Sequence, residues 1–234
     1  MKNQYFGDIN DYVKYGLLRC FAKAGLRIGV CWMLTPDDKR SDGRKIKYLS
    51  RPNEWAGHDS RLFNHLSKTL GARDGKHIRH IEGPIHIPHA RFFGALVTDS
   101  LAERIAWRKD MFAVLDGSDL LFFDPDNGIE VPSKAVGRKD SSKYIYWEEL
   151  TKSWKRAKSL LVFQHFPRMK RNEYISARVE EMTSRLPGSL ILPLRSPNAL
   201  FLLAYRQSDC TQISRAMEFI EKNWSRRVWR HNGT

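Results

Sequence analysis

Three short apolar segments are the feature that most limits how this chain can fold. They are continuous runs of apolar residues rich in strand formers, and they cover 27–34, 119–125 and 159–166. Segments of helical length, with apolar residues three and four positions apart, lie between and after them. Fully apolar strands that alternate with helices are typical of a parallel sheet covered on both faces. The sequence therefore predicts an α/β fold with three layers, α/β/α, and a mostly parallel central sheet.

The remaining segments complete this arrangement. We expect helices at 11–25, 59–71, 100–115, 171–186 and 210–227. The segment 189–206 indicates two antiparallel strands around a Ser-Pro-Asn turn, and the His-rich segment 76–90 indicates one or two short strands. Because 234 residues suit one large domain, we predict a single domain, 1–234, with basic loop insertions around 35–58 and 127–150.

The charge of the chain indicates a polyanionic partner. It carries 40 Lys and Arg residues against 26 Asp and Glu residues, for a formal net charge of +14. Lys and Arg side chains displace counterions from phosphates, so this excess favours nucleic acid. Seven Trp, eight Tyr and twelve Phe residues supply rings that can stack on bases. The alternative is a basic surface that only keeps the protein in solution.

Cysteine usage and hydropathy indicate the compartment. Cys20, Cys31 and Cys210 lie in apolar segments without a CxxC pair, as expected for reduced core residues. The polar N-terminal residues do not form a signal peptide, and no apolar run is long enough to span a membrane. We expect a cytoplasmic protein that needs no membrane and shows no obligate protein partner.

Polar side chains follow each of the three apolar segments. In chain order they are Asp37 and Asp38, then Asp124, Asp126 and Asn127, then Gln164, His165 and Arg168. The carboxyl ends of parallel strands meet at one edge of the sheet, where ligands bind in such folds. We expect these groups to share one cleft. The alternative is that residues 124–128 only form a turn, which their residue types favour.

A second group of polar residues precedes the first predicted helix. Asp8, Asn10 and Asp11 exceed what one helix cap requires, although one of them can simply be the cap. Lys14 lies one helical turn further and faces the same side as Asn10 and Asp11. We expect this segment to contribute to the same site.

Aromatic and basic loop residues are candidates for contacts with a nucleic acid. Tyr144, Tyr146 and Trp147 can stack on a base or pack in the core. Lys39, Arg40, Arg44 and Lys143, together with Lys14 and Arg168, are candidates to bind phosphates, although any one of them can be a solvated side chain.

The absence of some sequence motifs argues against several common functions. The chain has no GxGxxG and no GxxxxGK[ST], which argues against ordinary dinucleotide binding and nucleotide hydrolysis. Its histidines lack the compact spacing of a zinc site. Three alternatives stay open, and one of them is a nucleic-acid binder without catalytic activity. Asp37, Asp124, Asp126 and Glu130 can bind Mg²⁺ in a nuclease. The FFDP segment is similar to the strand end of amino-methyltransferases, although DPDN puts a charge where those enzymes have an aromatic ring.

Four segments carry a family resemblance: YFGDINDYVKYGLLR, FFDPDNG, SSKYIYWEEL and FQHFPR. Together they resemble bacterial antiviral DNA glycosylases. That group is similar to the uracil-DNA glycosylase superfamily and removes glucosylated hydroxymethylcytosine from phage DNA. The resemblance implies a uracil-DNA-glycosylase-like fold and a partner that is double-stranded DNA with modified bases. It implies an enzyme that flips and excises the modified cytosine and leaves an abasic site.

The resemblance also implies roles for individual residues. The GDIND segment corresponds to the loop that positions water, which points to Asp8, Asn10 or Asp11. The QHFPR segment corresponds to a His-Pro motif, with Phe166 inserted, and points to His165 as the group that assists the leaving base.

The remaining roles are our own interpretation of the residues. Asp124 or Asp126 would act electrostatically or bind the sugar, and the substrate-binding group would be Asp37, Asp38, Asn127, Tyr144, Tyr146, Trp147 and Gln164. Cleavage of an N-glycosidic bond needs a carboxylate near the sugar and a donor near the base. It requires no cofactor and no metal.

Overall fold

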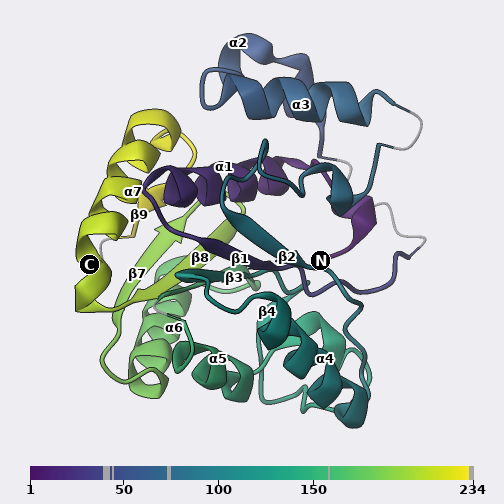
Figure 1. Ribbon diagram of the computed structural model, residues 1–234, viewed down its shortest axis with the longest axis vertical. Helices are drawn as coiled ribbons and strands as arrows, with labels where there is room; N and C mark the ends of the chain where they lie inside the picture. The colour runs from purple at the N-terminus through teal and green to yellow at the C-terminus, as the bar shows by residue number, and fades with distance from the viewer. Residues whose placement is uncertain (39–42, 44, 73–74, 158, 232–234) are drawn as a thin grey trace.

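The computed structural model describes residues 1–38, 43, 45–72, 75–157 and 159–231, and its centre is a seven-stranded sheet (Figure 1). The strands stand in the order β2, β1, β3, β6, β8, β7, β9. Their bounds are β1 Ile28–Cys31, β2 Ala90–Phe93, β3 Leu120–Phe123, β6 Ser159–His165, β7 Leu190–Arg195, β8 Ala199–Tyr205 and β9 Trp229–Arg230. A separate small parallel pair consists of β4 Gly128–Ile129 and β5 Tyr144–Ile145.

The sheet is mixed, which corrects the expectation of a mostly parallel one. Strands β2, β1, β3 and β6 pair in parallel. Strand β8 is antiparallel to both β6 and β7, and β9 is antiparallel to β7. The predicted antiparallel hairpin at 189–206 is confirmed. The three apolar segments that the sequence singled out are β1, β3 and β6, and they lie side by side.

Helices cover both faces of the sheet (Figure 1). Helix α1 Ile9–Lys23 and helix α7 Cys210–Trp224 pack on one face, with α2 Pro52–Trp55 and α3 Ser60–Leu70 beyond α1. Helix α4 Leu101–Val114, α5 Trp147–Trp154 and α6 Arg171–Arg185 cover the other face. The five predicted helices are therefore present, each within a few residues of its expected bounds.

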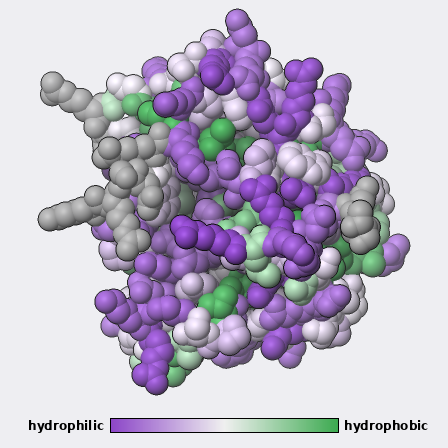
Figure 2. Space-filling view, turned by 180° about the vertical axis from the view of Figure 1, so that it is seen from behind, coloured by the Kyte–Doolittle hydropathy of each residue, from purple (hydrophilic) through white to green (hydrophobic). Residues whose placement is uncertain are grey.

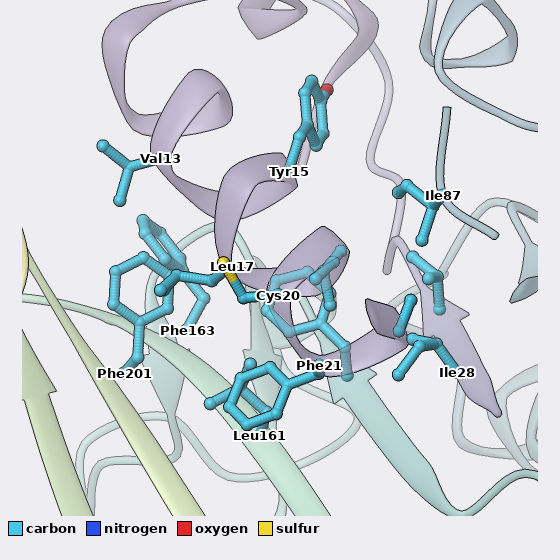
Figure 3. Packing of buried hydrophobic residues seen from close by; sticks show 14 of the residues in the cluster. Val13, Tyr15, Leu17, Cys20, Phe21, Ile28, Ile87, Leu161, Phe163 and Phe201 are labelled. Carbon is cyan, nitrogen blue, oxygen red and sulfur yellow. The ribbon is translucent and has the colours of Figure 1, made fainter. Parts of the chain in front are cut away.

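Each strand contributes side chains to two separate cores, because successive residues of a strand point to opposite faces. Ile28 and Val30 join the core under α1, whereas Cys31 joins the core under α4 to α6. Figure 3 shows the first core, where Leu17 and Phe21 of α1 lie over Leu161 and Phe163 of β6. The apolar strands of the sequence are thus explained by burial on both faces.

The His-rich segment differs from the prediction. Instead of one or two strands, 76–89 contains a single 3-10 turn, Ile78–His80, and strand β2 begins only at Ala90. His65 and His86 stack on each other with ring centroids 3.8 Å apart. Alternating apolar residues here place Ile78, Ile81 and Ile87 in the core without forming strands.

The surface is largely polar. Figure 2 shows one face covered mainly by hydrophilic residues, with apolar residues in small separate patches. Among the described residues, no helix has both the length and the apolar character needed to cross a membrane.

We predict that Gly16→Ala destabilises the fold, because α1 and α7 approach closely at this glycine. A Cβ at Gly16 would lie 2.0 Å from the ring of Trp224, which is fully buried. Overpacking of this kind costs about 1–3 kcal/mol. Chemical denaturation measures the loss. Gly57→Ala is the matched control, since a Cβ there meets nothing within 4 Å. Equal stability of the two variants would contradict the packing described here.

Candidate active site

A cavity of about 390 Å³ lies at the carboxyl edge of the parallel strands. Its walls come from the start of α1, from the turn before α1, from Gly43 and Lys45, and from the residues that follow β3 and end β6. The lining residues are Tyr5, Asp8, Asn10, Asp11, Lys14, Gly43, Lys45, Asp126, Phe163 and His165. The topology explains the position, because the strand order reverses next to β1, and ligands of α/β folds bind at that point.

Asp8 caps helix α1 and lines the cavity at the same time. Its Oδ1 accepts hydrogen bonds from the backbone N–H groups of Asn10, at 2.8 Å, and Asp11, at 3.0 Å. Burial raises the pKa of Asp8, while the charge of Lys14 and the two backbone N–H groups oppose the rise. The capping interpretation of this segment is therefore correct, and it does not remove the carboxylate from the cavity.

Lys14 is the cation at the floor of the cavity. Its side chain is 5% exposed, and Nζ lies 3.1 Å from Asp11 Oδ1 and 2.8 Å from Asp124 Oδ1. The same nitrogen lies 4.0 Å from the centre of the Phe163 ring. Lys14 is thus paired with two carboxylates of the protein while it lines the cavity, and its predicted contact with DNA phosphates stays a prediction.

Asp11 is held by donors from its own helix and the turn before it. Its Oδ2 accepts hydrogen bonds from Gly7 N–H and from the Tyr15 hydroxyl, each at 3.1 Å. Burial raises the pKa of Asp11 to about 7, against the lowering effect of Lys14. Asp124, 1% exposed, does not line the cavity, so its position supports Lys14 rather than a direct contact with substrate.

Asp126 lies in a second ion pair beside the first. Its Oδ1 is 2.7 Å from the amino group of Met1, and its Oδ2 accepts a hydrogen bond from the Thr35 hydroxyl at 2.8 Å. Although burial opposes it, the Met1 ammonium and the Thr35 hydroxyl hold the pKa of Asp126 below its usual value. Asp126 is therefore an ionised carboxylate at one wall of the cavity.

His165 ends β6 and is exposed at the mouth of the cavity. Its ring packs edge-on against Phe163, with centroids 4.8 Å apart. Desolvation of the ring and the positive charge of Lys14 lower the pKa of His165. The imidazole is consequently neutral at pH 7, with one nitrogen able to donate a hydrogen bond and the other able to accept one.

Several predicted substrate-binding residues lie elsewhere. Tyr146 and Trp147 are buried on the other face of the sheet, where Tyr146 OH donates to the Lys134 carbonyl and Trp147 Nε1 donates to Glu181. Gln164 is also buried, and it donates to the Asn127 carbonyl and accepts from Ile129 N–H. These three side chains complete the fold and do not line the cavity, so the structure gives no support to their predicted contact with substrate.

The other predicted residues are near the surface and outside the cavity lining. Asp37 accepts a hydrogen bond from Gln4 N–H, and Asp38 pairs with Lys2. Asn127 and Arg168 are exposed, Tyr144 is half-buried, and Lys143 pairs with Asp140 at 2.8 Å. The cavity lining therefore does not include Asp37, Asp38, Asn127, Tyr144, Lys143 or Arg168. The predicted residues Lys39, Arg40 and Arg44 lie outside the described residues.

Four lining residues were missed by the sequence analysis: Tyr5, Gly43, Lys45 and Phe163. Tyr5 belongs to the YFGDIND segment, so its proximity to Asp8 was a usable signal. Phe163 sits two residues before His165, and residues i and i+2 of a strand face the same side. Lys45 had no such signal, because the loop that brings it to Asp8 is long; its carbonyl accepts from Ile9 N–H at 3.1 Å.

The acids do not gather into a metal site. Asp124 pairs with Lys14, Asp126 pairs with the Met1 ammonium, and Asp37 lies near the surface. Within the described ranges, no group of three or more His, Cys, Asp or Glu side chains is placed to hold a metal ion. Of the carboxylates that the sequence offered to Mg²⁺, Asp124 and Asp126 are thus already paired with cations of the protein, and Glu130 accepts a hydrogen bond from Trp147 N–H.

Comparisons with protein-family models, with curated proteins and with solved structures give no match for this chain. The cavity itself is therefore the basis for inferring the function.

We predict that Lys14→Met destabilises the protein strongly, since it leaves Asp11 and Asp124 buried without their cation. Removal of one partner of a buried ion pair typically costs about 3–5 kcal/mol. Lys45→Met is the matched control, because Lys45 lines the same cavity but is exposed. Denaturant unfolding at pH 7 compares the two. A Lys14→Met variant as stable as Lys45→Met would refute the network.

We predict that His165 titrates below the value of about 6.5 that is usual for histidine. Because its pKa is lowered in the folded state, the unfolded chain takes up the proton first as the pH falls through 6.5. Protonation of His165 in the unfolded chain therefore lowers the free energy of unfolding as the pH falls. The His165→Gln variant should lose less of this free energy between pH 7 and pH 5. Proton NMR of the His165 ring gives the midpoint. A midpoint above 6.5 would contradict the description.

Proposed function

We propose that the protein is a DNA glycosylase that hydrolyses the N-glycosidic bond of a bulky modified cytosine, as the resemblance to antiviral glycosylases of phage DNA implies. The observation that carries this proposal is the cavity, which unites the Asp8 carboxylate and the neutral His165 imidazole around a floor of ion-paired side chains. A carboxylate near a sugar and a donor near a base are what such a reaction needs.

The chemistry assigns a separate task to each group. The bond between C1′ and the base nitrogen breaks with its electron pair on the base, so the deoxyribose becomes positive and the base negative. Asp8 stabilises the sugar cation and accepts a proton from water as the water oxygen bonds to C1′. His165, held neutral, donates a hydrogen bond to the departing base. The base anion takes up one proton from solvent and Asp8 releases its proton to solvent, so the reaction consumes one water and restores Asp8.

The size and lining of the cavity suit a base with a sugar attached. Small-molecule sites have volumes of about 300–1,000 Å³, and the cavity volume of about 390 Å³ falls in this range. Asn10, Asp126 and Lys45 add donors and acceptors to the wall. Hydroxyl groups of a glucosylated base need such partners, because buried polar groups without hydrogen bonds cost about 1–3 kcal/mol each. The base must leave the duplex to enter, at a cost of a few kcal/mol.

The two enzymatic alternatives have weaker support. A Mg²⁺-dependent nuclease needs converging carboxylates, and here Asp124 and Asp126 are paired with cations. A methyltransferase-like enzyme is favoured by the antiparallel β7 and β8 pair and by the Asp-Pro end of β3. However, Met1 fills the crevice between the ends of β1 and β3: its amino group donates to the carbonyls of Met33 and Asp124, each at 3.2 Å.

The direct test is incubation with glucosylated phage DNA and with unmodified DNA, both in EDTA. Mass spectrometry of the released bases and alkali cleavage of the DNA detect excision. We expect release of the modified base from the phage DNA alone, with alkali-labile sites. DNA cleavage that stops in EDTA would support the nuclease, and methyl transfer from S-adenosylmethionine would support the other alternative.

We predict that Asp8→Asn reduces base excision by about 100-fold or more, while DNA affinity stays unchanged. A positioned acid–base group contributes about 10²–10⁴-fold in rate. Asparagine caps helices as well as aspartate does, so this variant keeps the fold and removes only the charge. Single-turnover excision and a binding titration separate the two effects.

Asp37→Asn is the control for Asp8→Asn, because Asp37 accepts one backbone hydrogen bond near the surface and does not line the cavity. It should retain full excision. Undiminished excision by Asp8→Asn would remove Asp8 from the mechanism.

A further inference from the structure

A second depression lies at the opposite end of helix α1 from the cavity. It has a volume of about 800 Å³ and is bordered by the end of α1, the start of α3 and the end of α7. Four of its lining residues are Arg19, Lys23, Arg27 and Arg61, and its one acidic lining residue is Asp59. We refer to this depression as the basic groove.

The charges of the basic groove do not cancel. Asp59 is neutralised by Arg19, whose Nε lies 2.6 Å away, and Arg27 pairs with Asp119 at 2.9 Å. Lys23 and Arg61 are exposed, and within the part of the chain that the structure describes neither is recorded in an ion pair. Two positive charges are therefore left for a ligand.

The surroundings of these two cations support this assessment. Lys23 lies over the half-buried ring of Phe219, with Nζ 4.5 Å from the ring centre, so its stem is placed at the groove wall. Burial, His65, Arg19 and Arg61 together lower the pKa of His86 to about 4. The positive charge of Arg61 thus contributes to the lowering of the pKa at a neighbouring histidine.

The length of α1 fixes the distance between the groove and the cavity. Asp8 caps the first turn of the helix, and Lys23 is its last residue. Fifteen residues at 1.5 Å each give a helix about 22 Å long. Adjacent phosphates of one strand are about 3.4 Å apart along B-DNA, so this separation corresponds to roughly six or seven nucleotides.

We propose that the basic groove is a second binding site for the DNA backbone, in which Lys23 and Arg61 hold phosphates about six or seven nucleotides from the base in the cavity. The spacing rests on the proposed function of the cavity, whereas binding of DNA by the groove does not. The groove contacts phosphates alone and reads no sequence. The enzyme can therefore bind duplex DNA through the groove whether or not a modified base is present.

The test is the salt dependence of binding to an unmodified 20-base-pair duplex, for the wild type and for the double variant Lys23→Gln/Arg61→Gln. Each phosphate contact contributes about 0.9 to the slope of log affinity against log salt. The double variant should therefore lower the magnitude of the slope by about 1.8. The control is Lys109→Gln/Lys155→Gln, which removes two exposed cations from α4 and the end of α5, on the other face. It should leave the slope unchanged.

An unchanged slope in the groove variant, or an equal fall in both variants, would overturn the proposal.

Excision of modified bases from duplexes of increasing length supplies the second measurement. The rate at limiting substrate should rise until about seven nucleotides flank the base on one side, and the groove variant should lose this rise. A rate independent of length in the wild type would contradict the spacing.

The two proposals fail separately. A slope that falls as expected, without any excision, contradicts the glycosylase alone. Excision with an unaffected slope contradicts the groove alone.

Discussion

The ammonium group of Lys14 is the point on which the cavity depends. It joins three elements that are distant in sequence: Asp11 on its own helix, Asp124 after β3, and the Phe163 ring on β6. Charges so deeply buried are costly to desolvate, and only close partners with further hydrogen bonds offset that cost. The Gly7 N–H and the Tyr15 hydroxyl supply those bonds to Asp11. The start of α1 is thereby fixed against the carboxyl edge of the sheet, and with it the turn that presents Asp8.

This arrangement sets the charge state of the groups that face the cavity. Lys14 and burial together keep His165 neutral, while the pKa of Asp8 is raised by burial and restrained by Lys14 and by the N–H groups of α1. In the reaction that we propose, the Asp8 carboxylate and the neutral His165 imidazole act together on the glycosidic bond. In our proposal the basic groove adds a phosphate contact at the far end of α1, so the same helix would orient the DNA and present the reacting groups.

Much of this could be predicted from the sequence, and the failures share one cause. Continuous apolar segments identified β1, β3 and β6, and the polar residues at their ends identified the edge where Asp126 and His165 meet Asp8. The errors arose where polar or aromatic residues serve the fold. Gln164 satisfies the backbone beside Gly128, where no larger residue fits because a Cβ would lie 2.2 Å from the amide. Lys14 was expected at the site as a phosphate-binding candidate, but a sequence does not show which cations are enclosed by acids.

The measurement that tests the account most directly is a crystal structure of the Asp8→Asn variant bound to duplex DNA that contains one glucosylated hydroxymethylcytosine. We expect the modified nucleotide to be everted into the cavity, with its C1′ beside residue 8, its base against His165, and the ion pairs of Lys14 unchanged. A complex in which the nucleotide stays stacked, or in which the DNA lies elsewhere and leaves the cavity without a base, would contradict the central claim.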